Sequence, residues 1–563
     1  MIPVNSSAHD MLVQFNVETP MRDGVILRGD LYKPAGTEAW PVLLLRTVFR
    51  KRDFPRAFGQ YDPAVFVRAG YAVLIQDVRG LGESDGEFDR FTADGQDGYD
   101  TVEWIANQPW CDGNVGMMGS YYAGFLQLMA AIQNPPHLKA ICPMQTSVSV
   151  NRDCDNRGFL FASHIGWCLA RQISRLRDGR YDEAVTRKYL PLFLDALQDY
   201  IHTQVATVPL SQMPVLQDTP FPLLRDYYHH LVDGFDDLKL IHKEGRDLDL
   251  RTVHIPAFYI CGWYDSSRTP LLEHCLVQRS CGIPSQVLIA PWKPGEPPSR
   301  PDSALENGEN TVDLQSEIIR WFNRHLKGIG TDVPAPIRYY DIVSDFQYAS
   351  DSWIPNGSSL ERLLLTPDGA LQESEPSTSG FLTYYHDPAN PLPYHSFGVL
   401  PSWPSDTKNA VLLSRPFSVE CRIVGLVRTE LFISADVPDV DIMVSLLDVD
   451  PDGKTFVFCD GAVRARYRQD WNSRPLTPGQ IYPVSVLLGH IVYTLPAGHN
   501  LGIAIYGSAF PKYDVNHGTG LRPAHDADLK SANIRIHCGP DTPSALILPV
   551  LLDTNIPFRR IQQ

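Results

Sequence analysis

Residues 113–132, GNVGMMGSYYAGFLQLMAAI, place an apolar strand directly before a helix, with a short turn between them. A strand that turns this sharply into a helix needs small residues on both sides of the turn. Further short apolar runs and helical segments alternate before and after this junction. Strands that alternate with helices are typical of a parallel, doubly wound sheet. This junction therefore constrains the fold of the chain more than any other feature.

The surrounding segments extend the same pattern. We expect an antiparallel hairpin over residues 13–33, where apolar and polar residues alternate. The remaining expected strands are 41–49, 70–80, 138–146, 255–265 and 285–293, and the expected helices are 97–108, 122–132, 269–278 and 313–328. Between the two groups of strands, residues 158–176 and 191–205 are amphipathic and predict a helical cap.

After about residue 330, short alternating segments with Pro and Gly turns replace the helical pattern, as in a β-sandwich or jelly roll. The expected fold is an α/β-hydrolase core with a helical cap insertion and a C-terminal jelly-roll domain. The expected boundaries are 1–148 and 251–330 for the two parts of the core, 149–250 for the cap and 331–563 for the jelly roll.

Composition excludes several classes of function. The formal net charge is −16, and nucleic-acid-binding proteins carry basic stripes instead. No run approaches the roughly 18 apolar residues of a membrane span, and the first residues resemble no signal peptide. Ten cysteines are scattered without CxxC pairs. We therefore expect a cytoplasmic protein with free thiols and no cofactor or metal, acting on a small molecule without nucleic-acid or membrane partners. Nothing in the sequence opposes a homo-oligomer.

The central residue of the turn decides the chemistry. The tip of a nucleophile elbow is strained, and the residues two positions before and after it must be small. With Ser120 at the tip, these positions hold Met118 and Tyr122, which are too large. With Tyr121 at the tip, they hold Gly119 and an alanine, which fit. We therefore expect Tyr121 at the tip, and Ser120 pointing beside the helix or into the sheet.

Several longer motifs carry a family resemblance. The matching stretches are MRDGVILRGDLYKP (21–34), QDVRGLGESDGEF (76–88), GNVGMMGSYYAG (113–124), GWYD (262–265), YHDPANPLP (385–393), DGAVRARYR (460–468) and SAFPKYDVN (508–516). In this order they resemble the cocaine esterase and X-prolyl dipeptidyl-peptidase family of serine hydrolases over nearly the whole chain. The resemblance implies the same three-part fold as the patterns above.

The resemblance also implies where catalysis takes place, and the catalytic triad is degenerate here. The family elbow reads G-x-S-Y-x-G, so Tyr121 replaces the nucleophilic serine, while Asp265 matches the family aspartate. The family histidine closes a GPW-x-H motif, and in this sequence Pro294 stands at the position of that histidine. The oxyanion-hole tyrosine of an R-N-P-Y motif is replaced by Phe49. These losses oppose acyl transfer, which needs a nucleophile, a base and an oxyanion donor.

The remaining groups suggest a different use of the site. Tyr121 lies at a helix N-terminus, where the dipole favours the phenolate, and the backbone N–H of Tyr122 could still serve an oxyanion. Asp265 without its imidazole could act as a base or an acid. Lys293 could pair with Asp265, bind an anionic substrate or simply be solvated.

Ser120 as a nucleophile, and His164 or His274 as a replacement base, are weaker alternatives. Aromatic residues are frequent in the motifs that should line the cleft, and most of them should pack in the core. The expected substrate-binding set is Phe49, Ser120, His164, Trp167, Trp263, Trp292 and Lys293, with Phe161 as a further cap residue.

Three functions stay open. The first is a non-hydrolytic step on a small molecule through Tyr121 and Asp265, such as an isomerisation, cyclisation, elimination or C–C cleavage, with a place in natural-product biosynthesis. The second is hydrolysis of esters, amides or lactones by water that Asp265 activates. The third is an inert pocket that only binds a ligand.

Overall fold

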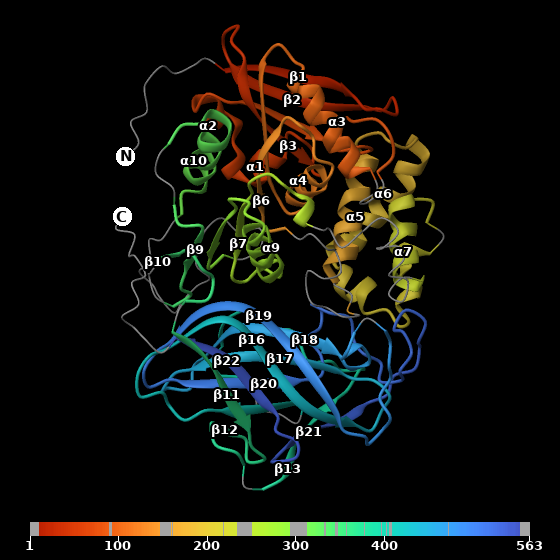
Figure 1. The fold of residues 1–563 in the computed structure, drawn as a ribbon. Helices are drawn as coiled ribbons and strands as arrows, with labels where there is room; N and C mark the ends of the chain where they lie inside the picture. Colours follow the sequence, from red (N-terminus) through yellow and green to blue (C-terminus); the bar gives the residue numbers. More distant parts are fainter. Residues whose placement is uncertain are drawn as a thin grey trace.

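The computed structural model describes residues 11–88, 93–146, 159, 162–217, 219–233, 250–292, 312–330, 334–343, 347–355, 357–376, 378–395, 397–400, 402–404, 408–470 and 472–551. The ribbon has three parts: a core at the top of Figure 1, three helices at its side and a β-domain below.

The core is built on one mixed sheet. Within the described ranges its strand order is β1-β2-β4-β3-β5-β6-β7-β8-β9-β10, and neighbours from β4 to β9 are parallel. The strands are β1 (Met11–Pro20), β2 (Ile26–Pro34), β3 (Trp40–Thr47), β4 (Ala72–Asp77), β5 (Cys111–Ser120), β6 (Leu138–Met144), β7 (Phe258–Gly262), β8 (Gln286–Ala290), β9 (Ile337–Tyr340) and β10 (Gln347–Ser350). The predicted hairpin is confirmed as the antiparallel pair β1–β2.

Helices cover both faces of this sheet, which is why its central strands are apolar throughout. Along β3, Leu44 packs in one hydrophobic cluster, whereas Leu43 and Leu45 pack in another. The first cluster includes residues of α3 (Asp94–Ala106), α4 (Tyr122–Ile132) and α9 (Arg268–Ser280). The second includes residues of α2 (Pro63–Arg68) and α10 (Leu314–Lys327). The predicted alternation of strands and helices is confirmed.

The cap consists of α5 (Ala162–Arg177), α6 (Glu183–Gln198) and α7 (Pro222–Asp233), at the right of the core in Figure 1. A third hydrophobic cluster joins these helices to Val48 and Val78, which follow β3 and β4. The sequence predicted a helix from residue 191, but α6 begins eight residues earlier because the Asp182 side chain caps its first turn.

The C-terminal part is a sandwich of two antiparallel sheets. One sheet joins β12 (Leu371–Gln372), β11 (Ser358–Leu365), β22 (Ala545–Leu551), β16 (Cys421–Ala435), β21 (Ala532–Cys538) and β13 (Gly380–His386), with β19 (Tyr482–Leu495) on β16. The other joins β14 (Gly398–Leu400), β18 (Thr455–Arg464), β17 (Asp441–Val449), β20 (Asn500–Tyr506) and β15 (Asn409–Leu413). The predicted fold class, a hydrolase-type core with a C-terminal β-domain, is confirmed.

The core sheet extends past residue 330, where the sequence pattern placed the start of the jelly roll. Strand β9 pairs with β8 in parallel, and β10 then pairs with β9. Short strands with turns on both sides look alike in a core sheet and in a sandwich, so the sequence pattern could not assign them.

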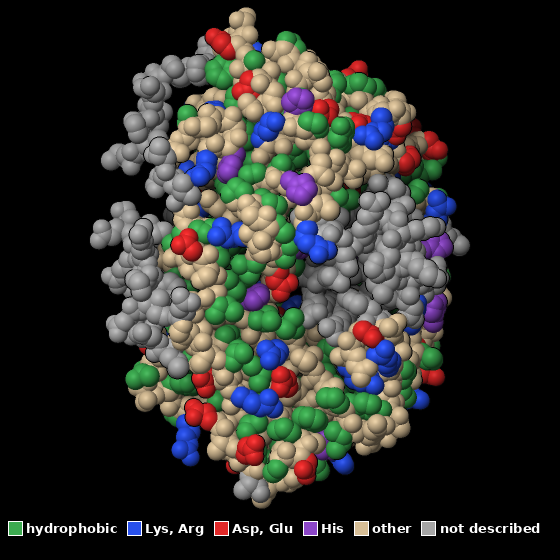
Figure 2. Space-filling view, in the orientation of Figure 1, with side chains coloured by type: hydrophobic (Ala, Val, Ile, Leu, Met, Phe, Trp, Pro, Cys, Tyr) green, Lys and Arg blue, Asp and Glu red, His purple; other side chains and the backbone are tan. Residues whose placement is uncertain are grey.

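The face of the molecule that Figure 2 shows is mixed in charge. On the face in Figure 2, basic and acidic side chains are interspersed with apolar ones. Among the described residues, no helix is both long and apolar enough to cross a membrane.

Candidate active site

The turn between β5 and α4 has the geometry of a nucleophile elbow, with Tyr121 at its tip. Tyr121 has φ 56° and ψ −123°, a conformation that a non-glycine residue rarely adopts. Its N–H donates to Met144 O at 3.0 Å, and its carbonyl accepts from Gly124 N and Phe125 N. The end of β6 on one side and the first turn of α4 on the other therefore fix the strained residue.

The small residues around the tip are required by packing. A Cβ atom on Gly119 would lie 2.7 Å from the Cβ of Ala123, well inside the carbon–carbon contact distance of about 3.5–4.0 Å. Gly124 approaches Thr146 equally closely, since a Cβ atom there would lie 2.7 Å from the threonine Cβ. Strand, helix and the end of β6 therefore meet as the elbow argument requires.

The Tyr121 phenol is held by a residue that the sequence analysis did not single out. Its hydroxyl donates to Gln145 Oε1 at 2.9 Å. Gln145 follows β6, is buried and has φ 44°. Within the described ranges, four non-glycine residues have positive φ, and the other two are asparagines, which tolerate it. The two remaining strained residues, Tyr121 and Gln145, are thus bonded to each other.

Ser120 does not reach the site. Its side chain is fully buried, and its Oγ lies 2.8 Å from the hydroxyl of Tyr61, which is also fully buried. The expectation that Ser120 points into the sheet agrees with this geometry. The predicted substrate-binding role of Ser120 does not agree with this position, because side chains alternate along a strand and the residue before the tip faces inward.

Asp265 lies in the loop between β7 and α9 and is buried. Its Oδ1 accepts from Ser267 N at 2.7 Å and from Ser267 Oγ at 2.6 Å. Burial raises the pKa of the carboxyl above its ordinary value, although the bonds from Ser267 and the charge of Arg268 oppose the rise. Among the described residues, no hydrogen bond joins Asp265 to the Tyr121 hydroxyl, so a joint role would need a substrate or water between them.

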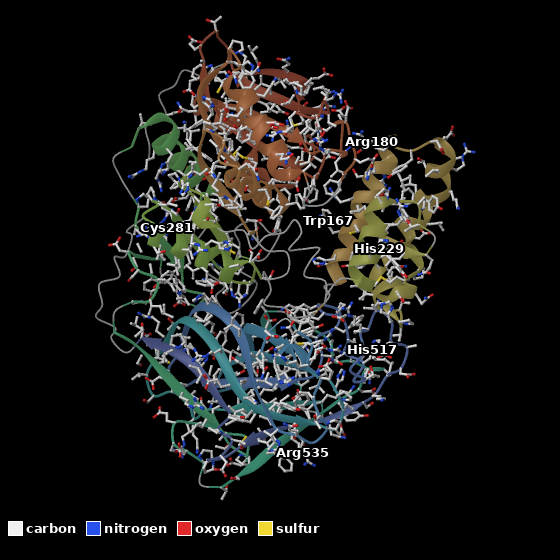
Figure 3. The ribbon with its side chains drawn as sticks, turned by 45° about the vertical axis from the view of Figure 1, so that its right-hand side comes forward. Trp167, Arg180, His229, Cys281, His517 and Arg535 are labelled. Atoms are coloured by element: carbon white, nitrogen blue, oxygen red, sulfur yellow. The ribbon has the colours of Figure 1, made fainter. Side chains whose placement is uncertain are left out.

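Tyr122 connects the elbow to the cap. Its hydroxyl donates to Asp94 Oδ2 at 2.7 Å, and its ring stacks on Trp167 of α5 with centroids 6.0 Å apart. Trp167 lies between cap and core in Figure 3, and His164 lies one turn earlier on α5, half-buried. Because α4 begins at Tyr122, its backbone N–H lies at the helix N-terminus, where anions are favoured.

Phe49 lies near the tip through a chain of aromatic rings. The centroids of Phe49 and Phe58 are 6.0 Å apart, and those of Phe58 and Tyr121 are 5.9 Å apart. All three rings are half-buried. The Arg171 guanidinium of α5 lies over Phe49, 4.3 Å from the ring centroid. The structure thus brings together Tyr121, Phe49 and, around Tyr122, Trp167.

Two of the residues predicted to bind the substrate, Trp263 and Trp292, lie in the hydrophobic core. Trp263 is fully buried, and its Nε1 donates to Tyr340 O at 2.6 Å. Trp292 is buried with Leu288 and Phe322 in the hydrophobic cluster that includes residues of α10. Both follow apolar strands whose ends are covered by neighbouring elements, so the predicted substrate-binding role of these two tryptophans does not agree with their buried positions. Lys293, Pro294 and Phe161 lie outside the described residues.

His274 is unsuited to the role of a replacement base. Its ring packs against Tyr259 of the sheet, 6.5 Å between centroids. Burial lowers the pKa of His274 to about 3, so the ring is too weak a base for proton abstraction near neutral pH.

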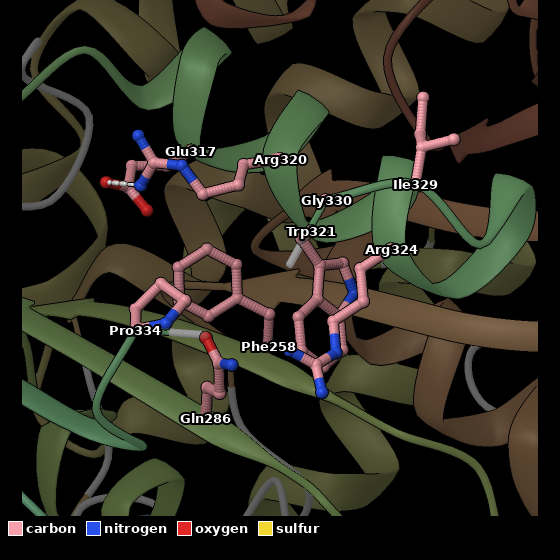
Figure 4. A pocket seen from close by; sticks show the side chains of 9 residues that line it. All are labelled: Phe258, Gln286, Glu317, Arg320, Trp321, Arg324, Ile329, Gly330 and Pro334. Atoms are coloured by element: carbon pink, nitrogen blue, oxygen red, sulfur yellow. Dashed lines mark hydrogen bonds and ion pairs between the residues drawn. The ribbon is translucent and has the colours of Figure 1, made fainter. Parts of the chain in front are cut away.

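A cleft with a volume of about 210 Å³ borders the Asp265 loop on the side of the β-domain. Tyr264 and Ser266 line it from the core, and Phe397 and the ion pair of Lys512 with Asp460 line it from the sandwich. A second, smaller hollow lies against α10 around Trp321 and Arg324 (Figure 4), and none of its lining residues belongs to the elbow or the Asp265 loop. In the described part of the chain, no group of His, Cys, Asp or Glu side chains is arranged to hold a metal.

Fold and site together define an α/β-hydrolase with a cap and a C-terminal β-domain. Residues 23–293 match the model of the X-Pro dipeptidyl-peptidase (S15) family, and residues 330–547 match the C-terminal non-catalytic domain of X-Pro dipeptidyl-peptidases. The chain is 31% identical to the cocaine esterase of Rhodococcus sp. over 576 residues, which span 96% of this chain and 98% of that protein. The chain belongs to the family of hydrolytic enzymes that includes cocaine esterase and the X-Pro dipeptidyl-peptidases.

Solved structures agree with this fold. An aminopeptidase from a marine sediment Thaumarchaeota archaeon has a TM-score of 0.82 at 21% identity, and the match covers 97% of each chain. An α-amino acid ester hydrolase has a TM-score of 0.78 at 21% identity, again over 97% of each chain.

Proposed function

We propose that this member of the family converts a small organic molecule by proton transfer rather than by serine-type acyl transfer. The observation that carries the proposal is the strained, hydrogen-bonded pair of Tyr121 and Gln145 at the elbow. Backbone strain of this kind costs about 1–3 kcal/mol per residue and concentrates at functional sites. A phenol thus occupies the place at which the family resemblance puts the serine, and in the sequence Pro294 stands in place of the histidine.

The hydrogen-bond pattern favours particular roles for the two titratable groups. Because Gln145 Oε1 can only accept, the Tyr121 hydroxyl must donate to it and is protonated. The phenol can therefore anchor a substrate oxygen or give it a proton once Gln145 is displaced. Asp265, whose pKa is raised by burial, can exchange a proton closer to neutral pH than an ordinary carboxyl. Isomerisation, cyclisation, elimination and C–C cleavage all need such an acid–base pair.

A second candidate is hydrolysis of an ester, amide or lactone by water that Asp265 activates. It is favoured by membership of a hydrolase family and by the Asp265 pKa. A cytoplasmic location and a place in natural-product biosynthesis complete the proposal, and the nine free cysteines in the described part of the chain support the location.

The test compares wild type with Tyr121→Phe and Asp265→Asn, on an activated aryl ester and on metabolite extracts analysed by mass spectrometry. Tyr99→Phe is the matched control, because Tyr99 lies under Arg22 and not at the elbow. The proposal expects no ester cleavage, and a metabolite converted without change of mass or with loss of water or a fragment, dependent on Tyr121. Ester cleavage that is lost in Asp265→Asn would establish the second candidate. A ligand retained without turnover in all variants would show an inert pocket.

A further inference from the structure

Arg171 is a positively charged group that the cap brings to the elbow. Its Nη1 donates to Val48 O at 2.8 Å, and its guanidinium lies over the ring of Phe49. Phe49 in turn packs on Phe58, and Phe58 packs on Tyr121. The guanidinium is therefore separated from the tip of the elbow by a short chain of half-buried rings.

Arg171 has no acidic partner among the described residues. Its Nε is buried and makes no hydrogen bond. Asp178, which directly follows α5, makes its ion pair with Arg50 and acts on Arg171 only through its nearby charge. One turn further along α5, Arg175 donates to Glu87 at 2.5 Å. Arg175 thus attaches the cap to an acidic residue of the core, whereas Arg171 makes no ion pair with a described residue, and the nearby charge of Asp178 offsets its burial only in part.

The direction of the remaining donors is informative. In a guanidinium, Nε–H and one Nη2–H point the same way and match the two oxygens of a carboxylate. Val48 O occupies Nη1, so this bidentate edge is the part of Arg171 that makes no hydrogen bond with a described residue. Burial lowers the pKa of Arg171 to about 10, which leaves the group charged at neutral pH, and a buried charge without a partner is unfavourable.

We propose that Arg171 binds the carboxylate of the substrate, with the apolar part of that substrate against Phe49 and Phe58. The proposal rests on the proposed function in placing the substrate beside the elbow, and it narrows the substrate class to aryl or alkyl carboxylic acids. The alternative role of Arg171 is to attach the cap to the core through its hydrogen bond to Val48 O. That role needs one N–H donor and no bound carboxylate.

The experiment is isothermal titration calorimetry with two probes of equal shape, 4-phenylbutyrate and 4-phenylbutyramide. Charge-assisted bidentate bonds predict a preference of about 10- to 100-fold for the carboxylate in wild type. Arg171→Gln should bind both probes equally, and Arg171→Lys should keep part of the preference. Arg177→Gln is the matched control, because Arg177 lies on the same helix and is exposed.

Thermal unfolding of each variant shows whether the cap remains folded. Equal or undetectable binding of the two probes by wild type would overturn the proposal, and so would a preference that survives in folded Arg171→Gln. The calorimetric result does not depend on turnover. Ester hydrolysis by wild type would therefore refute the non-hydrolytic function while leaving the carboxylate preference to be decided by the titration.

Discussion

Gly119→Ala tests whether the close meeting of β5 and α4 determines the elbow. The new Cβ would lie 2.7 Å from Ala123 Cβ and 3.2 Å from the Ala123 carbonyl carbon and oxygen. Two of these atoms are backbone, so α4 must move, because no side chain can rotate away. Gly119 also has φ 148°, which an alanine rarely adopts.

The expected loss of stability has two parts. Overpacking costs about 1–3 kcal/mol, and an alanine in a glycine-type conformation costs about 1–3 kcal/mol more, so about 4 kcal/mol in total is reasonable. A core that unfolds as a unit of about 300 residues has an unfolding entropy of about 0.6 kcal/mol per kelvin. The melting temperature should therefore fall by about 6 °C.

Differential scanning calorimetry measures this change, with Gly179→Ala as the control. Gly179 also has positive φ, at 72°, but nothing lies within 4 Å of its added Cβ, so the control carries strain without the clash. We expect it to lower the melting temperature by about 2 °C. If Gly119→Ala and Gly179→Ala have the same melting temperature, β5 and α4 do not meet tightly at Gly119. The packing reason for placing Tyr121 at the tip would then be wrong.

Three further predictions address single contacts. Ser120→Ala leaves the buried Tyr61 hydroxyl without its partner and should lower the free energy of unfolding by about 1–3 kcal/mol in urea; a fluorophosphonate that labels Ser120 in wild type would contradict its buried position. Since burial raises the pKa of Asp265, the fold favours the neutral acid, and this contribution is lost as pH rises from 3.8 through the folded pKa. Asp265→Asn should therefore gain melting temperature relative to wild type between pH 4 and 7, and a constant difference would show that the carboxyl is not desolvated. Lys512→Met leaves Asp460 unpaired in the cleft and should cost about 3 kcal/mol in urea, which Asp460→Asn in the same chain should partly restore; a loss no larger than that of the exposed Arg187→Met would place the pair in solvent.

Local pattern was sufficient for most of the fold. Strands β17 and β19 lie in the region after residue 330 for which the sequence pattern predicted short strands, because a run of strand-type residues between Pro and Gly turns is a local signal. The elbow register was also accessible, because the clash between Gly119 and Ala123 is set by residues four positions apart.

Long-range contacts explain what the sequence analysis missed. Gln145 meets Tyr121 only because β5 and β6 are neighbours, and Arg171 meets Val48 across 123 positions. The single signal for Gln145 was its place directly after an apolar strand, where parallel strands bring side chains together. Trp263 was misassigned because its partner, Tyr340, belongs to a strand that the sequence pattern did not place in the core sheet.

The strained pair at the elbow also argues for a role of the Tyr121 side chain itself. A glycine would adopt φ 56° at no steric cost, and the backbone bonds to Met144, Gly124 and Phe125 would remain. Such a glycine would make the turn and nothing more. Tyr121 and Gln145 both add backbone strain to the turn. In return, a hydrogen bond joins the Tyr121 hydroxyl to the Gln145 amide where the neighbouring strands β5 and β6 end. In open α/β sheets, ligands bind at the carboxyl ends of the strands. The strained turn therefore holds the Tyr121 phenol at the end of the sheet where a ligand would bind.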